Sequence, residues 1–140
     1  MTPPVLPAAR SLPAPTDALA RALEPGAIHS AYQPIVDLAT DRVLAVEALA
    51  RGPRGPLATP DALFAAARAT GRLPALEARC TEAAIAGALR AGLDMPLFVN
   101  LEPDAVDSAS LAVLRRGDAL AAGRVPLVLD VTERALTARP

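Results

Sequence analysis

Three polar side chains interrupt apolar stretches of the sequence, each near the end of its stretch: Glu47 in 42–50, Asn100 in 97–101 and Asp130 in 125–131. Two carboxylates and an amide oxygen form an all-oxygen ligand set, which suits Mg²⁺ or Mn²⁺ and not zinc. Arg51 lies just beyond Glu47 and could hold a phosphate group next to such a metal. This combination predicts metal-assisted attack of water on a phosphate ester.

Each of these residues also has a structural alternative. Glu47 could be a core carboxylate that is paired with a cation of the fold. Asn100 could cap the turn before Pro103, and Asp130 could cap the turn that follows it by accepting a hydrogen bond from a backbone N–H. The structural role would be favoured for Asn100 or Asp130 alone. Their shared position near strand ends, together with Glu47, favours the metal site.

The first two strands that would position these residues lie close together in the chain. Residues 28–38 read as a strand interrupted by Pro34, and residues 42–50 follow after a turn at 39–41. So short a connection predicts an antiparallel hairpin. Residues two apart share one face of a strand, so Glu47, Leu49 and Arg51 should point the same way.

Two helices are predicted between the second and third strands. Thr59 caps the first, with Pro60 at its first position, and Gly71 ends it. The second helix runs from Pro74 to Ala91. Its charged residues are interpreted as a solvated face: Glu77, Arg79, Glu82 and Arg90.

The rest of the chain continues the alternation of strands and helices. Residues 97–101 are apolar on both faces except for Asn100, which indicates a parallel strand covered on both sides. A helix from Pro103 to about Arg116 and a strand over 125–131 follow. The order predicts an α/β fold with a mainly parallel sheet, whose strands present their carboxyl ends at one rim.

Composition narrows the function classes. The chain has 140 residues, the size of one domain, and a net charge of −1, so no basic field exists to bind a nucleic acid polymer or a membrane surface. Its one cysteine, Cys80, permits no internal disulfide, and no apolar run approaches the roughly 18 residues of a membrane span. We therefore expect a cytoplasmic protein. The proline-rich residues 1–15 are predicted to be a disordered tail or linker, and residues 16–140 the domain.

Four segments carry a family resemblance: 32–37 (YQPIVD), 47–51 (EALAR), 99–103 (VNLEP) and 129–133 (LDVTE). In order and spacing they resemble the motifs of the EAL domain family, bacterial phosphodiesterases that linearise the second messenger cyclic di-GMP. The resemblance runs from about Asp17 to the last residue. It implies a modified TIM barrel with an antiparallel first strand, and Mg²⁺ or Mn²⁺ as cofactor.

The resemblance also implies roles for individual residues. Glu47 and Asn100 would be metal ligands, and Asp130 would occupy a further ligand position. Arg51 would contact a phosphate of cyclic di-GMP, Gln33 would lie against the ligand, and Leu49 would help to wall the pocket. The family usually has glutamate where this chain has Asp130, which is one methylene shorter, and Mg²⁺ tolerates little displacement of its ligands.

Length sets the final expectation, because a TIM barrel needs about 250 residues. By resemblance, this chain is the N-terminal half of an EAL-type phosphodiesterase that hydrolyses cyclic di-GMP to linear pGpG. It holds no complete catalytic set, and it is expected to be inactive as this truncated chain. The alternative is a degenerate, non-catalytic EAL module that binds a nucleotide or another protein, as a homodimer or with the missing C-terminal half. An unrelated α/β domain would require Glu47, Asn100 and Asp130 to scatter in space.

Overall fold

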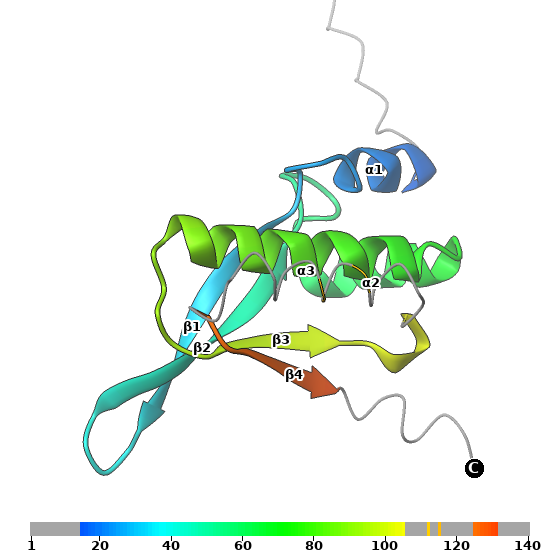
Figure 1. Cartoon of the computed structure of the whole chain (residues 1–140). Coiled ribbons are helices and arrows are strands. Elements are labelled where there is room, and N and C mark those ends of the chain that lie inside the picture. Colours follow the sequence, from blue (N-terminus) through cyan, green and yellow to red (C-terminus); the bar gives the residue numbers. More distant parts are fainter. Residues whose placement is uncertain (1–14, 106–111, 113–114, 116–124, 132–140) are drawn as a thin grey trace, which may run out of the picture.

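The computed structural model describes residues 15–105, 112, 115 and 125–131. Within them, four strands form one sheet in the order β1-β2-β3-β4 (Figure 1). The strands are β1 (His29–Asp37), β2 (Arg42–Arg51), β3 (Leu97–Leu101) and β4 (Leu127–Val131). The helices are α1 (Pro15–Ala22), α2 (Pro60–Ala69) and α3 (Leu73–Arg90), and a 3-10 turn covers Pro103–Ala105. The predicted tail at 1–15 and most of the predicted helix after Pro103 lie outside the described residues.

The first two strands form the predicted antiparallel hairpin, in which Gln33 lies opposite Glu47. The carboxylate of Asp37 closes the turn by accepting hydrogen bonds from the backbone N–H of Ala39 at 2.8 Å and the hydroxyl of Thr40 at 2.9 Å. Asp41 completes it with a φ of 54°, a conformation that aspartate tolerates better than most residues. The local chemistry of the turn fixes the pairs next to it, and a register shift between Ile35 and Val36 then sets the pairing that places Gln33 opposite Glu47.

The remaining strand pairs are parallel. Between β2 and β3, the pairing covers only Val46–Ala48 against Leu97–Val99. Between β3 and β4 it is longer, and it places Asn100 opposite Asp130. An antiparallel first strand beside parallel strands, with helices in the connection from β2 to β3, confirms the predicted α/β class and the start of a TIM-like barrel.

Helix α3 lies across one face of the sheet (Figure 1). Val46, Ala48, Leu97 and Val99 are buried there with side chains of α3 in one apolar cluster. The opposite face of the same strands carries Glu47, Phe98 and Asn100, which are half-buried. The prediction that β3 is covered on both sides is therefore not met within the described residues, because the helices that pack on it lie on one face.

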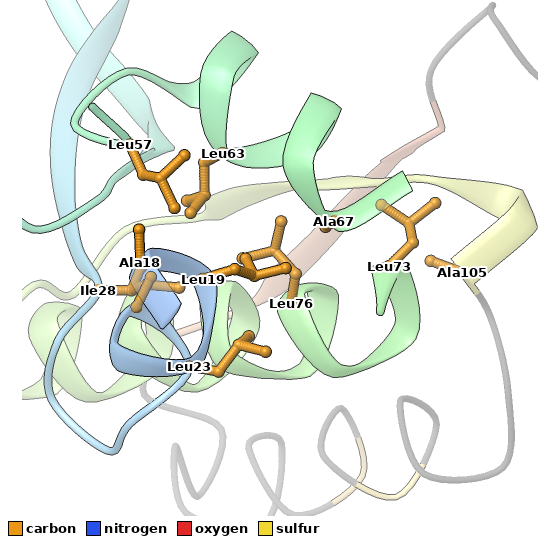
Figure 2. Packing of buried hydrophobic residues seen from close by; sticks show 11 residues of the cluster. Ala18, Leu19, Leu23, Ile28, Leu57, Leu63, Ala67, Leu73, Leu76 and Ala105 are labelled. Carbon is orange, nitrogen blue, oxygen red and sulfur yellow. The ribbon is translucent and has the colours of Figure 1, made fainter. Parts of the chain in front are cut away.

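A second apolar cluster joins the three helices near the start of α3 (Figure 2). Leu19 from α1, Leu63 from α2 and Leu76 from α3 are all 0% exposed at its centre. The predicted cap at Thr59 is present, since its hydroxyl accepts a hydrogen bond from the N–H of Ala62. This cluster packs α2 and α3 against each other. It thereby also holds in place the residues of the two helices that contact the sheet.

Tyr32 provides a close contact between β1 and α3. Its hydroxyl donates a hydrogen bond of 2.7 Å to the carbonyl oxygen of Ala84. A Cβ added at Gly87 would overlap this hydroxyl and would lie 3.2 Å from the ring carbon Cζ. Gly87 is therefore required by the approach of a side chain and not by backbone conformation.

We predict that Gly87→Ala lowers the free energy of unfolding by about 1–3 kcal/mol, because overpacking outweighs the better helix propensity of alanine. Denaturant unfolding measures the change. The Tyr32→Phe background removes the overlapping hydroxyl, so Gly87→Ala should cost less there. Equal costs in both backgrounds would contradict this explanation.

Candidate functional site

Glu47 and Asn100 contact each other directly. The side-chain amide of Asn100 donates a hydrogen bond of 2.7 Å from Nδ2 to Oε1 of Glu47. Both side chains are half-buried, and they come from neighbouring parallel strands. Within the described residues, this contact leaves Oε2 of Glu47 and Oδ1 of Asn100 without a hydrogen-bond partner. Two hard oxygen atoms are therefore available at this point of the sheet.

Asp130 lies beside this pair in the sheet. It is the register partner of Asn100 across β3 and β4, and its side chain is exposed. Glu47, Asn100 and Asp130 thus occupy the carboxyl-terminal halves of three adjacent parallel strands. The scattered arrangement that an unrelated domain would require is not observed. The roles of the three residues as ligands stay predictions.

The predicted substrate-binding residues lie along the hairpin. Gln33 is exposed on β1 opposite Glu47. Leu49 is half-buried, and Arg51 ends β2, where its guanidinium donates a hydrogen bond of 2.9 Å to the carbonyl oxygen of Ala50. Arg51 forms no ion pair with any described carboxylate. Its charge therefore remains available to an anionic ligand.

A pocket of about 530 Å³ opens between the carboxyl ends of the strands and the two long helices. Leu49 and Asn100 line it from the sheet. Phe64 and Arg68 line it from α2, and Glu77 lines it from α3. The pocket is thus continuous with one predicted metal ligand and with one predicted wall residue.

Glu77 is a residue that the sequence interpretation placed wrongly. It was predicted on a solvated face of α3, yet it is 2% exposed. Burial raises the pKa of its carboxyl from 4.5 to about 7. The spacing contained the signal, because Glu77 follows Leu73 by four residues and precedes Cys80 by three, which places it on the apolar stripe. Arg79 and Glu82 form an ion pair of 2.7 Å with more exposed side chains, as expected.

Glu102 and Arg68 were also missed by the sequence interpretation. They form an ion pair of 2.9 Å between Nη2 of Arg68 and Oε2 of Glu102, directly after the end of β3. The guanidinium carbon of Arg68 lies 5.9 Å from the centre of the Phe64 ring, a cation–π contact. No spacing in the sequence connects residues so far apart, so only the packing of α2 against the strand end reveals this pair.

Cys80 packs as a small apolar residue against the cluster that joins the helices. Burial, with a smaller contribution from the nearby Glu77 carboxylate, raises the pKa of its thiol to about 12. A thiol in this state stays protonated at neutral pH, and it is therefore a poor nucleophile and a poor metal ligand.

The donor types present fit a hard divalent cation. Carboxylate and amide oxygens are the ligands that Mg²⁺ and Mn²⁺ prefer. Among the described residues, no group of three histidine, cysteine or acidic side chains comes together as a metal cage. Any site here would therefore use the Asn100 amide oxygen together with Glu47, and Asp130 is the nearest further acid in the register.

Comparison with known proteins decides the family. Residues 16–140 match the EAL domain family. The chain belongs to this family. No curated protein matches the chain.

Solved structures of EAL proteins share the fold. The FimX EAL domain of Xanthomonas citri, in complex with c-diGMP, superimposes with a TM-score of 0.70 at 22% identity. That match covers 87% of this chain and 50% of the FimX chain. The calcium/cy-diGMP complex of Klebsiella pneumoniae BlrP1 gives 0.65 at 29% identity, covering 81% of this chain and 29% of the other. The manganese/cy-diGMP complex of BlrP1 gives 0.64 at 29% identity, covering 84% and 30%.

The chain thus spans half or less of the solved EAL proteins described above. In the part of the chain that the structure describes, no helix has the length and apolar character that crossing a membrane requires.

The pKa of Glu77 predicts a pH-dependent term in stability. Its pKa is raised in the folded state, so its contribution is fully present below about pH 4.5 and is lost as the pH rises through about 7. Relative to Glu77→Gln, the wild-type chain should therefore lose up to about 3 kcal/mol of unfolding free energy between pH 4.5 and 8. Urea denaturation at stepped pH measures this difference. The exposed Glu82→Gln serves as control, and a flat difference for Glu77→Gln would contradict the burial argument.

Proposed function

We propose that this chain forms part of a metal-dependent phosphodiesterase domain that hydrolyses cyclic di-GMP to linear pGpG. The observation that carries the proposal is the 2.7 Å contact between Glu47 and Asn100, which brings hard oxygen donors from β2 and β3 together in a member of the EAL family. BlrP1, at 29% identity, has been solved with manganese and cyclic diGMP. A negatively charged phosphodiester would be held beside the metal.

Different residues of this chain would bind the metal, hold the phosphate and line the pocket. Glu47 and Asn100 would hold Mg²⁺ or Mn²⁺, with Asp130 as a further ligand. When bound, the metal would act as a Lewis acid on the phosphodiester and would lower the pKa of a water molecule. Arg51, which no described carboxylate neutralises, would hold a phosphate oxygen by charge-assisted hydrogen bonds. Gln33 would contact the ligand, and Leu49 would form an apolar wall of the pocket.

Hydrolysis would need more strands than these. A TIM barrel closes with eight parallel strands, and its active site draws on residues from several of them. We infer that residues 16–140 supply the first four strands of such a domain and that residues 1–15 act as a linker. The 140-residue polypeptide by itself is expected to show no hydrolysis.

A second candidate is a non-catalytic EAL module that acts by binding cyclic di-GMP or a protein. Two observations favour it. Asp130 is shorter than the usual glutamate, and its side chain is exposed. Leu129 and Val131, on the same strand, are 44% and 49% exposed, and an apolar strand of this kind invites a partner such as a second copy or the rest of the barrel.

Removal of a metal ligand tests the enzyme. In the whole protein that its gene encodes, Glu47→Gln and Asn100→Ala should each lower Mn²⁺-dependent hydrolysis of cyclic di-GMP by about 100-fold or more. The reason is that loss of an outer partner of a ligand already costs about 10–100-fold, and a ligand should cost at least as much. Chromatographic detection of pGpG measures the rate. The exposed Glu82→Gln is the control, and unchanged hydrolysis in Glu47→Gln would overturn the proposal.

Variants of Asp130 distinguish the enzyme from the non-catalytic module. Asp130→Glu restores the longer side chain and should tighten Mn²⁺ binding and raise the hydrolysis rate, whereas Asp130→Ala should weaken both. Isothermal titration with Mn²⁺ measures the affinity. If the wild-type protein binds cyclic di-GMP without hydrolysing it, and only the Asp130→Glu variant hydrolyses it, the non-catalytic module is the better description. If Asp130→Ala changes neither quantity, Asp130 is not a ligand.

A further inference from the structure

Glu77 is a buried carboxyl group that the proposed reaction does not use. Its side chain is 2% exposed, and its Oε1 accepts a hydrogen bond of 2.8 Å from the backbone N–H of Glu102. Among the described residues, no cation forms an ion pair with it. A carboxylate buried with so little compensation is costly. Its position is therefore best understood from the backbone group that it holds.

That backbone group lies two residues beyond Asn100. The pairing of β2 with β3 ends at Ala48 and Val99, so Asn100 is the first residue of β3 past the pairing on that side. Glu77 fixes the chain on the far side of Asn100, at Glu102. On the side of β2, Asn100 therefore lies between the last backbone pair before it and the Glu77 contact after it, while on its other side it stays paired with Asp130 of β4.

The side chain of Glu102 is held as well, by Arg68 of α2. The side chains of this ion pair are 39% and 16% exposed, and partly exposed pairs of this kind contribute little. The bond from Glu77 is part-buried, comes from a side chain that is 2% exposed, and acts on the backbone itself. Of the two contacts, the one from α3 therefore has the greater control over the path of the chain after β3.

We propose that Glu77 is a positioning residue for Asn100: by holding the N–H of Glu102, it places the Asn100 side chain against Glu47. Buried groups one step removed from a ligand commonly set ligand orientation in this way. The inference rests on the proposed function where it concerns metal binding. It stands on geometry where it concerns the contact between Asn100 and Glu47.

The test uses variants of Glu77 in the whole protein. Glu77→Gln keeps an acceptor oxygen at the same reach, whereas Glu77→Met has none and Glu77→Asp withdraws the carboxylate by one methylene. Mn²⁺ affinity, measured by isothermal titration, should weaken about tenfold in Glu77→Met and Glu77→Asp and stay within about twofold of wild type in Glu77→Gln. Thr81→Val is the matched control, because Thr81 is 3% exposed on the same helix.

Loss of stability alone would not produce this pattern, since Thr81→Val should leave the affinity unchanged. If Glu77→Met fails to fold, Glu77→Asp decides. Wild-type affinity in a folded Glu77→Met or Glu77→Asp, or equal weakening in Glu77→Gln, would overturn the proposal.

A second readout does not depend on metal. In nuclear magnetic resonance spectra, hydrogen exchange at the Glu102 amide should accelerate in Glu77→Met and Glu77→Asp, and the side-chain amide signals of Asn100 should shift. Glu77→Gln should preserve both. If wild-type protein binds no Mn²⁺, the proposed function fails and these signals alone decide. Unshifted Asn100 signals in Glu77→Asp would then overturn the inference.

Discussion

The hydrogen bond between Asn100 and Glu47 joins two strands at the point where their backbone pairing stops. Within the described residues, parallel strands β2 and β3 share only three residue pairs, and beyond them β2 stays paired with β1 while β3 stays paired with β4. A single contact of 2.7 Å between an amide and a carboxylate carries the alignment further toward the carboxyl ends. The candidate metal site depends on this alignment.

The two long helices support that alignment from one side of the sheet (Figure 1). The apolar cluster around Leu19, Leu63 and Leu76 packs α2 and α3 together (Figure 2). Each of the two helices also contributes one charged side chain that contacts Glu102. Arg68 reaches the side chain of Glu102, and Glu77 reaches its backbone. A few polar contacts therefore connect the helices that form the apolar core with the carboxyl end of β3.

Burial raises the pKa of two neighbouring groups on α3, with different consequences for each. Cys80 is made inert, because burial keeps its thiol protonated. The pKa of Glu77 is raised to about 7, so its carboxyl group is partly ionised at neutral pH. The ionised form lowers the stability of the fold. The contact that this group makes, with the backbone N–H of Glu102, is the one on which its proposed positioning role rests.

Sequence alone determined the hairpin, the two central helices, the parallel strands and the family. These follow from local rules: the short turn at 39–41, the cap at Thr59, the glycine after each helix and the motifs around Glu47, Asn100 and Asp130. Alternation along β2 also placed Glu47 on the face opposite the buried Val46 and Ala48. The spacing of α3 placed Glu77 on the apolar stripe, but tertiary structure alone decided that Arg68 meets Glu102 and that Asn100 touches Glu47. Contacts of this kind cannot be predicted from local rules, because the hydrogen-bond partners are distant in the chain: Glu77 and Glu102 are 25 residues apart, and Glu47 and Asn100 are 53 residues apart.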